Sequence, residues 1–167
     1  MRTLLVPMAG RSSRFPNLRP KWQLTHPMTN RFMVTEAILG LNLDFFDNIY
    51  FICLQEHEDK YHFMKGFVSE LDELGLREKS NIVLLPEQTQ SQSETVYTFL
   101  SGQKLEGFVF IKDSDGFYRC DVEERNQVAY FDLNDMDNIN AKAKSYVELD
   151  INNVLTNIVE KKVISST

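Results

Sequence analysis

Short apolar segments alternate with longer amphipathic ones over the first two-thirds of the chain. The apolar runs are each bounded by turn-forming or polar residues, which is typical of strands buried in a parallel sheet. They cover residues 3–8, 48–54, 81–85 and 107–111. Helices are expected at 32–41, 56–76 and 91–100, and the second of these carries Phe63, Phe67, Leu71 and Leu74 at helical spacing. This alternation predicts an α/β fold, a Rossmann-like three-layer domain on a mostly parallel mixed sheet.

The last third of the chain is expected to be richer in strand. Alternating or β-branched residues predict strands at 127–133, 145–150 and 154–161. The polar stretch at 132–144 is expected to form an exposed excursion. We find no internal repeat, low-complexity tract or linker, so a single domain over residues 1–167 is predicted.

Composition narrows the classes of function. The chain has 167 residues and a net charge of −6, and its pI near 5.1 argues against a general nucleic-acid-binding protein. No apolar run is long enough to span a membrane. Cys53 and Cys120 form neither a metal-binding pair nor a disulfide framework, which fits a reducing compartment. We therefore expect a cytoplasmic protein with no nucleic-acid or membrane partner, and a small anionic ligand stays compatible with these values.

The loop after the first apolar run is the first candidate site. In an open α/β sheet, ligands bind beyond the carboxyl ends of the strands. Small residues here would let backbone N–H groups approach an anion, while Arg14 and Lys21 could contact phosphate oxygens. A surface turn with solvated arginines is the alternative. The candidate nucleotide-binding residues of this loop are Ala9, Gly10, Arg11, Ser12 and Ser13.

Two further loops follow buried strands. In the loop at 87–95, Gln88 carries an amide that could donate to and accept from a base edge, and Ser91 is a second candidate. Alternatively, Ser91 or Ser93 caps the following helix. In the loop at 112–118, Asp113 and Asp115 come just beyond a buried strand, where an acidic residue is placed to hold Mg²⁺ against phosphates, because hard cations prefer oxygen ligands. Asp113 and Asp115 also match the Asp-x-Asp of glycosyltransferases, and a plain turn is the third interpretation.

Taken in order, these segments resemble the sugar-1-phosphate nucleotidyltransferases, and in particular bacterial capsule and surface-polysaccharide members, including cytidylyltransferases. Ser12 and Ser91 stand where that family usually has glycine. Near the end of the chain, the pair Glu160-Lys161 matches the family's acceptor-binding pair. The positions of the first loop that match the family's motif are Gly10, Ser13, Arg14, Phe15, Pro20 and Lys21.

The resemblance implies transfer of a nucleoside monophosphate from a nucleoside triphosphate to a small phosphorylated acceptor, with release of pyrophosphate. It implies that Gln88 reads the base and that Asp115 holds Mg²⁺. It also implies that Arg14 stabilises the leaving pyrophosphate, and that Lys21 stabilises the α-phosphate. CTP is favoured as the nucleotide, and dTTP and UTP stay open.

The family normally continues for several elements past the acceptor pair, so we expect a shortened member. The sequence leaves two alternative functions open: a non-catalytic nucleotide-binding remnant or subunit, and a glycosyltransferase with an Asp-x-Asp metal site. Assembly into a homo-oligomer also stays open.

Overall fold

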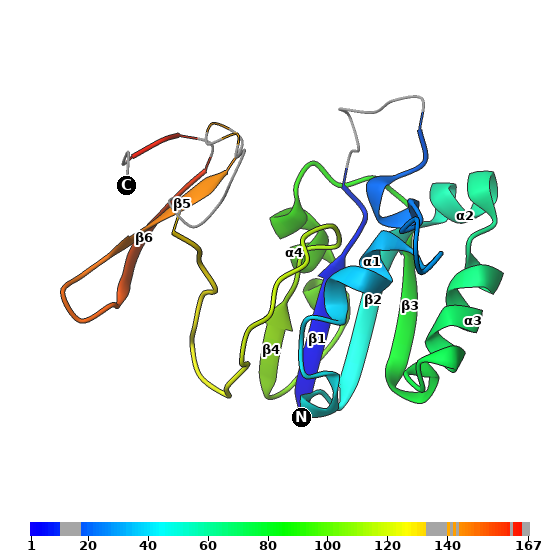
Figure 1. Cartoon of the computed structure of the whole chain (residues 1–167), viewed down its shortest axis with the longest axis horizontal. Helices are drawn as coiled ribbons and strands as arrows, with labels where there is room; N and C mark the ends of the chain where they lie inside the picture. The colour runs from blue at the N-terminus through cyan, green and yellow to red at the C-terminus, as the bar shows by residue number, and fades with distance from the viewer. Residues whose placement is uncertain (11–17, 133–139, 141, 143, 161, 165–167) are drawn as a thin grey trace. The chain divides into compact units, whose positions relative to one another are not determined.

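The structure is a computed structural model that describes residues 1–10, 18–132, 140, 142, 144–160 and 162–164, with only the backbone of Glu160 described. The chain divides into two compact units, Met1–Glu124 and Arg125–Thr167, each described by itself (Figure 1). The single domain predicted over residues 1–167 stays a prediction.

A four-stranded parallel sheet forms the centre of the first unit. Its strands are β1 (Arg2–Pro7), β2 (Asn48–Leu54), β3 (Ser80–Leu85) and β4 (Phe108–Ile111). Their order is β3-β2-β1-β4, so β1 pairs with a neighbour on both sides (Figure 1). Leu4 of β1 lies opposite Ile49 of β2 and opposite Phe110 of β4. All four strands match the predicted apolar runs to within a residue or two, which confirms the α/β fold.

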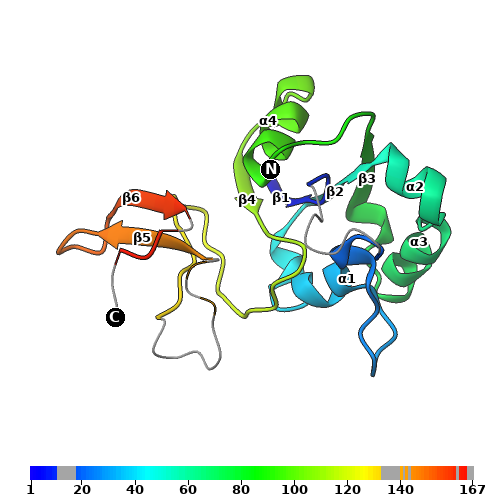
Figure 2. The same ribbon diagram turned by 90° about the horizontal axis from the view of Figure 1, so that it is seen from above.

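Helices cover both faces of this sheet. Successive residues of a strand point to opposite faces, so Leu4 and Val6 of β1 pack in one core while Leu5 packs in the other. The first core includes α1 (Met33–Ile38) and α3 (Met64–Glu73), and the second includes α4 (Gln92–Gly102). Seen from above, α1 and α4 lie on opposite sides of the strands (Figure 2). The predicted three-layer arrangement is therefore confirmed.

Aromatic rings fill the core on the α1 and α3 side. Phe67 is fully buried, and its ring lies 4.8 Å from that of Phe51 on β2. Trp22 contacts Phe63 at 4.8 Å and Phe67 at 6.2 Å between ring centroids. Trp22 belongs to a short 3-10 helix, Lys21–Gln23, so this core also fixes the segment next to the first candidate loop. Two other 3-10 helices cover Leu43–Phe45 and Arg77–Lys79.

The helix predicted at 56–76 is wrong as one element, because the structure has α2 (Gln55–Tyr61) and α3 instead. The break falls at His62, which has a left-handed φ of 49°. Glu58 holds both sides of it, since its carbonyl accepts from the N–H of His62 at 2.9 Å and its carboxylate accepts from that of Met64 at 2.9 Å. The apolar residues at helical spacing, Phe63, Phe67, Leu71 and Leu74, all follow the break, so they predicted α3 but not where α2 ends.

The second unit contains an antiparallel pair, β5 (Ser145–Leu149) and β6 (Leu155–Glu160). Both lie within the predicted ranges. The strand predicted at 127–133 is wrong, because residues 127–132 have no strand pairing and residue 133 lies outside the described residues. Val128, Tyr130 and Phe131 are about half exposed, at 46%, 56% and 52%. The alternating pattern was present, but strand propensity acts only where neighbouring strands and side chains pack.

Most of the polar stretch at 132–144 lies outside the described residues. Within the described part of the chain, no helix is long and apolar enough to cross a membrane.

Replacing Phe67 tests the packing of α3 on the sheet. Phe67→Ala should lower the free energy of unfolding by about 3–5 kcal/mol, because it leaves a cavity between four aromatic rings. Urea denaturation measures this loss. Tyr97→Ala on α4, where Tyr97 is 73% exposed, is the control and should change the value by no more than about 0.5 kcal/mol. Equal small losses in both variants would contradict the described core.

Candidate functional site

The carboxyl ends of the parallel strands bring the first two candidate loops together. After β1, the N–H of Met8 still donates to the carbonyl of Ile52 at 2.8 Å, and Ala9 is fully buried. Gly10 then forms a parallel bridge with Thr89, whose hydroxyl donates to the carbonyl of Ala9 at 3.2 Å. The start of the first loop therefore lies beside the loop that carries Gln88.

Lys21 and Asp115 meet at this same edge of the sheet. The Lys21 Nζ lies 3.0 Å from Asp115 Oδ2, although the two residues are 94 positions apart. Their side chains are 29% and 37% exposed, so both stay accessible to a ligand. The residues predicted to bind phosphate and metal are thus direct neighbours.

The other residues predicted around the phosphates are only partly described. Arg11, Ser12, Ser13 and Arg14 lie outside the described residues, so their roles stay predictions. Gln88 is exposed. Ser91 is the N-cap of α4, because its hydroxyl accepts from the N–H of Glu94 at 3.1 Å. The alternative of a helix cap is therefore confirmed for Ser91.

Lys112 is a residue of this region that sequence reasoning missed. Its side chain is fully buried, and its backbone N–H extends the pairing of β4 with β1 by donating to the carbonyl of Leu5 at 2.9 Å. Its ammonium donates to the Asp113 carbonyl at 3.0 Å, to the Asp113 carboxylate and to the Gly116 carbonyl. It also lies 4.2 Å from the centre of the Tyr118 ring. The only signal in the sequence was a lysine that directly continues an apolar run.

The two carboxylates of the Asp-x-Asp segment therefore have different partners. Asp113 contacts the buried Lys112, whereas Asp115 contacts Lys21. The described residues contain no cluster of three or more His, Cys, Asp or Glu that could hold a metal. Mg²⁺ is commonly bound by one or two carboxylates together with substrate phosphates. Asp115 therefore fits an ion that binds with a nucleotide.

Tyr118 is partly buried beside two charged side chains, Lys112 and Asp113. Burial raises the pKa of its hydroxyl, and the charge of Asp113 adds to that increase. Tyr118 is consequently neutral at physiological pH, and its ring supplies an uncharged face to the Lys112 ammonium.

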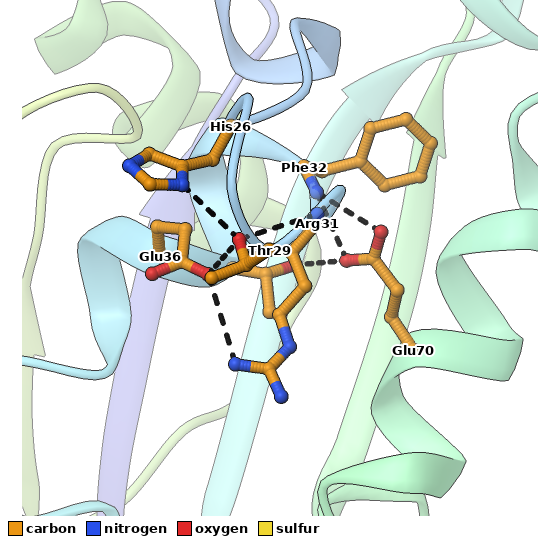
Figure 3. A network of polar contacts seen from close by, with 7 residues as sticks. His26, Thr29, Arg31, Phe32, Glu36 and Glu70 are labelled. Carbon is orange, nitrogen blue, oxygen red and sulfur yellow. Dashed lines mark hydrogen bonds and ion pairs between the residues drawn. The ribbon is translucent and has the colours of Figure 1, made fainter.

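A polar network fixes the hairpin that follows Lys21. This hairpin covers residues 24–33, and it closes where the N–H of Met33 donates to the carbonyl of Leu24 at 2.7 Å. The Glu70 carboxylate accepts from Phe32 N–H at 2.9 Å and from the Thr35 hydroxyl at 2.7 Å, and therefore caps α1 from a distant helix. Figure 3 shows Glu70 facing this helix start. Burial raises the pKa of Glu70, although these hydrogen bonds oppose the shift.

The hairpin has a second set of contacts near its turn. Thr29 donates to the Glu36 carboxylate at 2.6 Å and lies 3.3 Å from a ring nitrogen of His26, while Arg31 pairs with Glu36 at 3.7 Å (Figure 3). Both ends of the hairpin are therefore tied to α1, which restricts the path of the chain leading away from Lys21.

The predicted acceptor pair belongs to the second unit. Glu160 is the last residue of β6, and Lys161 lies outside the described residues. Their assignment to the acceptor stays a prediction.

Comparison with known proteins supports the fold. No protein-family model matches the chain, and no curated protein matches it in sequence. Among solved structures, the nucleoside-diphosphate-sugar pyrophosphorylase from Vibrio cholerae RC9 is similar, with a TM-score of 0.62 and 20% identity. The match covers 97% of this chain and 68% of that protein. At this identity the likeness establishes the fold, a Rossmann-like α/β domain.

Lys21 should matter little for folding. An ion pair between two partly exposed side chains contributes about 1 kcal/mol at most, so Lys21→Ala should lower the free energy of unfolding by no more than that. Urea denaturation measures this loss, and the loss in Phe67→Ala, measured in the same way, is the comparison. A loss as large as that of Phe67→Ala would mean that Lys21 is a structural residue.

Glu70 should make stability depend on pH. Because its pKa is raised in the folded state from the usual 4.5, the folded protein binds this proton more tightly than the unfolded chain. The stabilisation that comes from the proton on Glu70 is fully present at pH values below the usual pKa, and it is lost as the pH rises through the raised pKa of the folded state. Glu70→Gln should remove this decline, as measured by urea unfolding across pH 4 to 8. Glu106→Gln, at an exposed glutamate, is the control, and an unchanged pH profile for Glu70→Gln would contradict the assignment.

Proposed function

We propose that the protein is a nucleotidyltransferase. It would move a nucleoside monophosphate, with CTP the favoured donor and dTTP or UTP the alternatives, onto a small phosphorylated acceptor. The observation that carries this proposal is the 3.0 Å contact between Lys21 and Asp115 at the carboxyl edge of a parallel sheet. A bound triphosphate needs a cation for its phosphate oxygens and a carboxylate for its metal ion close together, and Lys21 and Asp115 supply these two groups.

The reaction needs positioning and charge neutralisation rather than a protein nucleophile. An oxygen of the acceptor phosphate attacks the α-phosphorus in line. The bond from that phosphorus to the bridging oxygen breaks, and pyrophosphate leaves with the electron pair. Lys21 stabilises charge on the α-phosphate and on the incoming phosphate, and Arg14 stabilises the leaving pyrophosphate. When bound at Asp115, Mg²⁺ supplies further neutralisation of phosphate charge.

The similar structure supports the same chemistry. It is named a nucleoside-diphosphate-sugar pyrophosphorylase, and attack of pyrophosphate on a nucleoside-diphosphate-sugar is nucleotidyl transfer in reverse. Within this proposal, Ala9, Gly10, Ser12 and Ser13 surround the phosphates, and Gln88 reads the base. Glu160 and Lys161 bind the acceptor. A cytoplasmic role in making precursors for capsule or surface polysaccharide follows from the resemblance of the motifs.

The glycosyltransferase alternative is less favoured by the geometry. An Asp-x-Asp site uses both carboxylates on one metal, whereas here Asp113 contacts the buried Lys112 and Asp115 contacts Lys21, so the two carboxylates have different partners. A nucleotide-binding protein without catalytic activity is the other alternative, and activity measurements separate it from the proposal.

Pyrophosphate release tests the function directly. We expect release in Mg²⁺ for one combination of CTP, dTTP, UTP or ATP with phosphocholine, a phosphorylated amino-acid derivative or a sugar-1-phosphate. Lys21→Ala should lower kcat by about 100-fold or more, because it removes charge stabilisation in the transition state. Lys104→Ala, at an exposed lysine far along the chain, should leave kcat unchanged.

The other outcomes are equally specific. Thermal stabilisation by one nucleotide without pyrophosphate release would favour the non-catalytic nucleotide-binding protein. Absence of both release and nucleotide binding would overturn the proposed function.

A further inference from the structure

We propose that Lys112 is a positioning residue that shapes the loop from Asp113 to Gly116 and thereby directs Asp115 toward the nucleotide. This inference rests on the proposed function, because it assigns a role to a residue that acts through Asp115. Lys112 itself has no exposed side-chain surface. It therefore acts without touching a ligand.

The hydrogen bonds of the ammonium define the loop. A lysine ammonium has three donors, and the three acceptors here are the Asp113 carbonyl, the Asp113 carboxylate and the Gly116 carbonyl. The two ends of the loop are thus drawn to one buried charge. Asp115 lies between them, and its carboxylate contacts Lys21 instead.

Close packing fixes the loop further. A Cβ added at Gly116 would lie 2.5 Å from Asp113 Oδ2, so the carboxylate whose other oxygen contacts Lys112 would have to shift. Tyr118, whose ring lies beside the ammonium, has its backbone against Gly40, where an added Cβ would be 2.0 Å from the Tyr118 carbonyl oxygen. Small changes at either glycine would therefore move the groups that surround Lys112.

The charge has a specific consequence. An ammonium without solvent is costly unless oxygen atoms surround it, so the loop must keep its two carbonyls and the Asp113 carboxylate turned inward. An apolar side chain of similar length would fill the same space but would not require this. The buried charge therefore separates the roles of the two carboxylates, since Asp113 neutralises Lys112 and Asp115 is left for the site.

The experiment measures how much Mg²⁺ strengthens nucleotide binding. For each variant, calorimetry gives the Kd of the nucleotide in EDTA and in Mg²⁺, and their ratio is the metal-dependent gain. The probe is whichever of CTP, UTP and dTTP stabilises the wild-type protein most in a thermal shift assay. The variants are Lys112→Met, Asp115→Asn and the double variant.

Asp115→Asn and Lys112→Met should each reduce the gain by about tenfold or more, which is the usual effect of disturbing a metal ligand's surroundings. The Kd in EDTA should change by less than about twofold in Lys112→Met. The double variant should lose no more than Asp115→Asn alone, because both changes act on one carboxylate. A merely structural role would weaken binding equally in EDTA, or would add to the effect of Asp115→Asn.

Two further variants keep the test decisive. Lys79→Met is the matched control, since the Lys79 ammonium donates to the Leu43 carbonyl at 2.8 Å and lies 3.7 Å from the Asp44 carboxylate. It should keep the wild-type gain. If Lys112→Met does not fold, Gly116→Ala replaces it, because the added methyl disturbs the contact between Asp113 and Lys112 while every charge is kept. Gly116→Ala should also reduce the metal-dependent gain in nucleotide affinity. It should do so only in a protein that keeps Asp115, and not in combination with Asp115→Asn.

The failures are distinguishable. If the gain is lost in Asp115→Asn but intact in folded Lys112→Met or in Gly116→Ala, the role of Lys112 is overturned while the proposed function stands. If the wild-type protein binds none of the three nucleotides, the proposed function and this inference fail together. If nucleotide binds but Asp115→Asn keeps the full gain, the metal role of Asp115 is overturned, and the inference is overturned with it.

Discussion

Backbone hydrogen bonding of β1 to a parallel neighbour on each side is the constraint on which the rest of the structure depends. A strand in this position is covered on both faces, so its side chains must be apolar in both directions, as Leu4 and Leu5 are. Parallel pairing also places the carboxyl ends of all four strands at one edge. The loops that follow β1, β3 and β4 are neighbours for that reason, and the contacts between Gly10 and Thr89 and between Lys21 and Asp115 are its results.

The candidate site at this edge holds its charges in two separate pairs. Lys112, whose side chain is fully buried, pairs with Asp113, and Lys21 and Asp115 form a second pair in which both side chains are partly exposed. This second pair is cheap to separate, because solvent already weakens the attraction between its members. A phosphate and its cation could therefore exchange partners with Lys21 and Asp115 without disturbing the pair of Lys112 and Asp113.

The fold was predictable because apolar runs with polar boundaries identify buried strands, and because the carboxyl-edge rule predicts which loops converge. Other features depend on tertiary contacts that spacing does not encode. The break at His62 depends on Glu58, whose carboxylate accepts from the N–H at the start of the next helix, and no local spacing encodes that contact. From the sequence, Lys112 looks like an ordinary solvated lysine after a strand. Its burial depends on contacts with the Gly116 carbonyl and the Tyr118 ring, which the sequence pattern does not predict.

The close contact between Gly40 and the Tyr118 carbonyl has a consequence for recognising relatives of this protein. Gly40 follows the first helix and belongs to none of the candidate loops, yet its lack of a side chain allows the backbone beyond Asp115 to approach that helix closely. A signature confined to residues 112–118 would therefore be incomplete. Distant homologues that share this loop should combine a buried lysine and a glycine within it with a second glycine after the first helix, and this three-part pattern would distinguish them from chains in which Asp-x-Asp merely ends a strand.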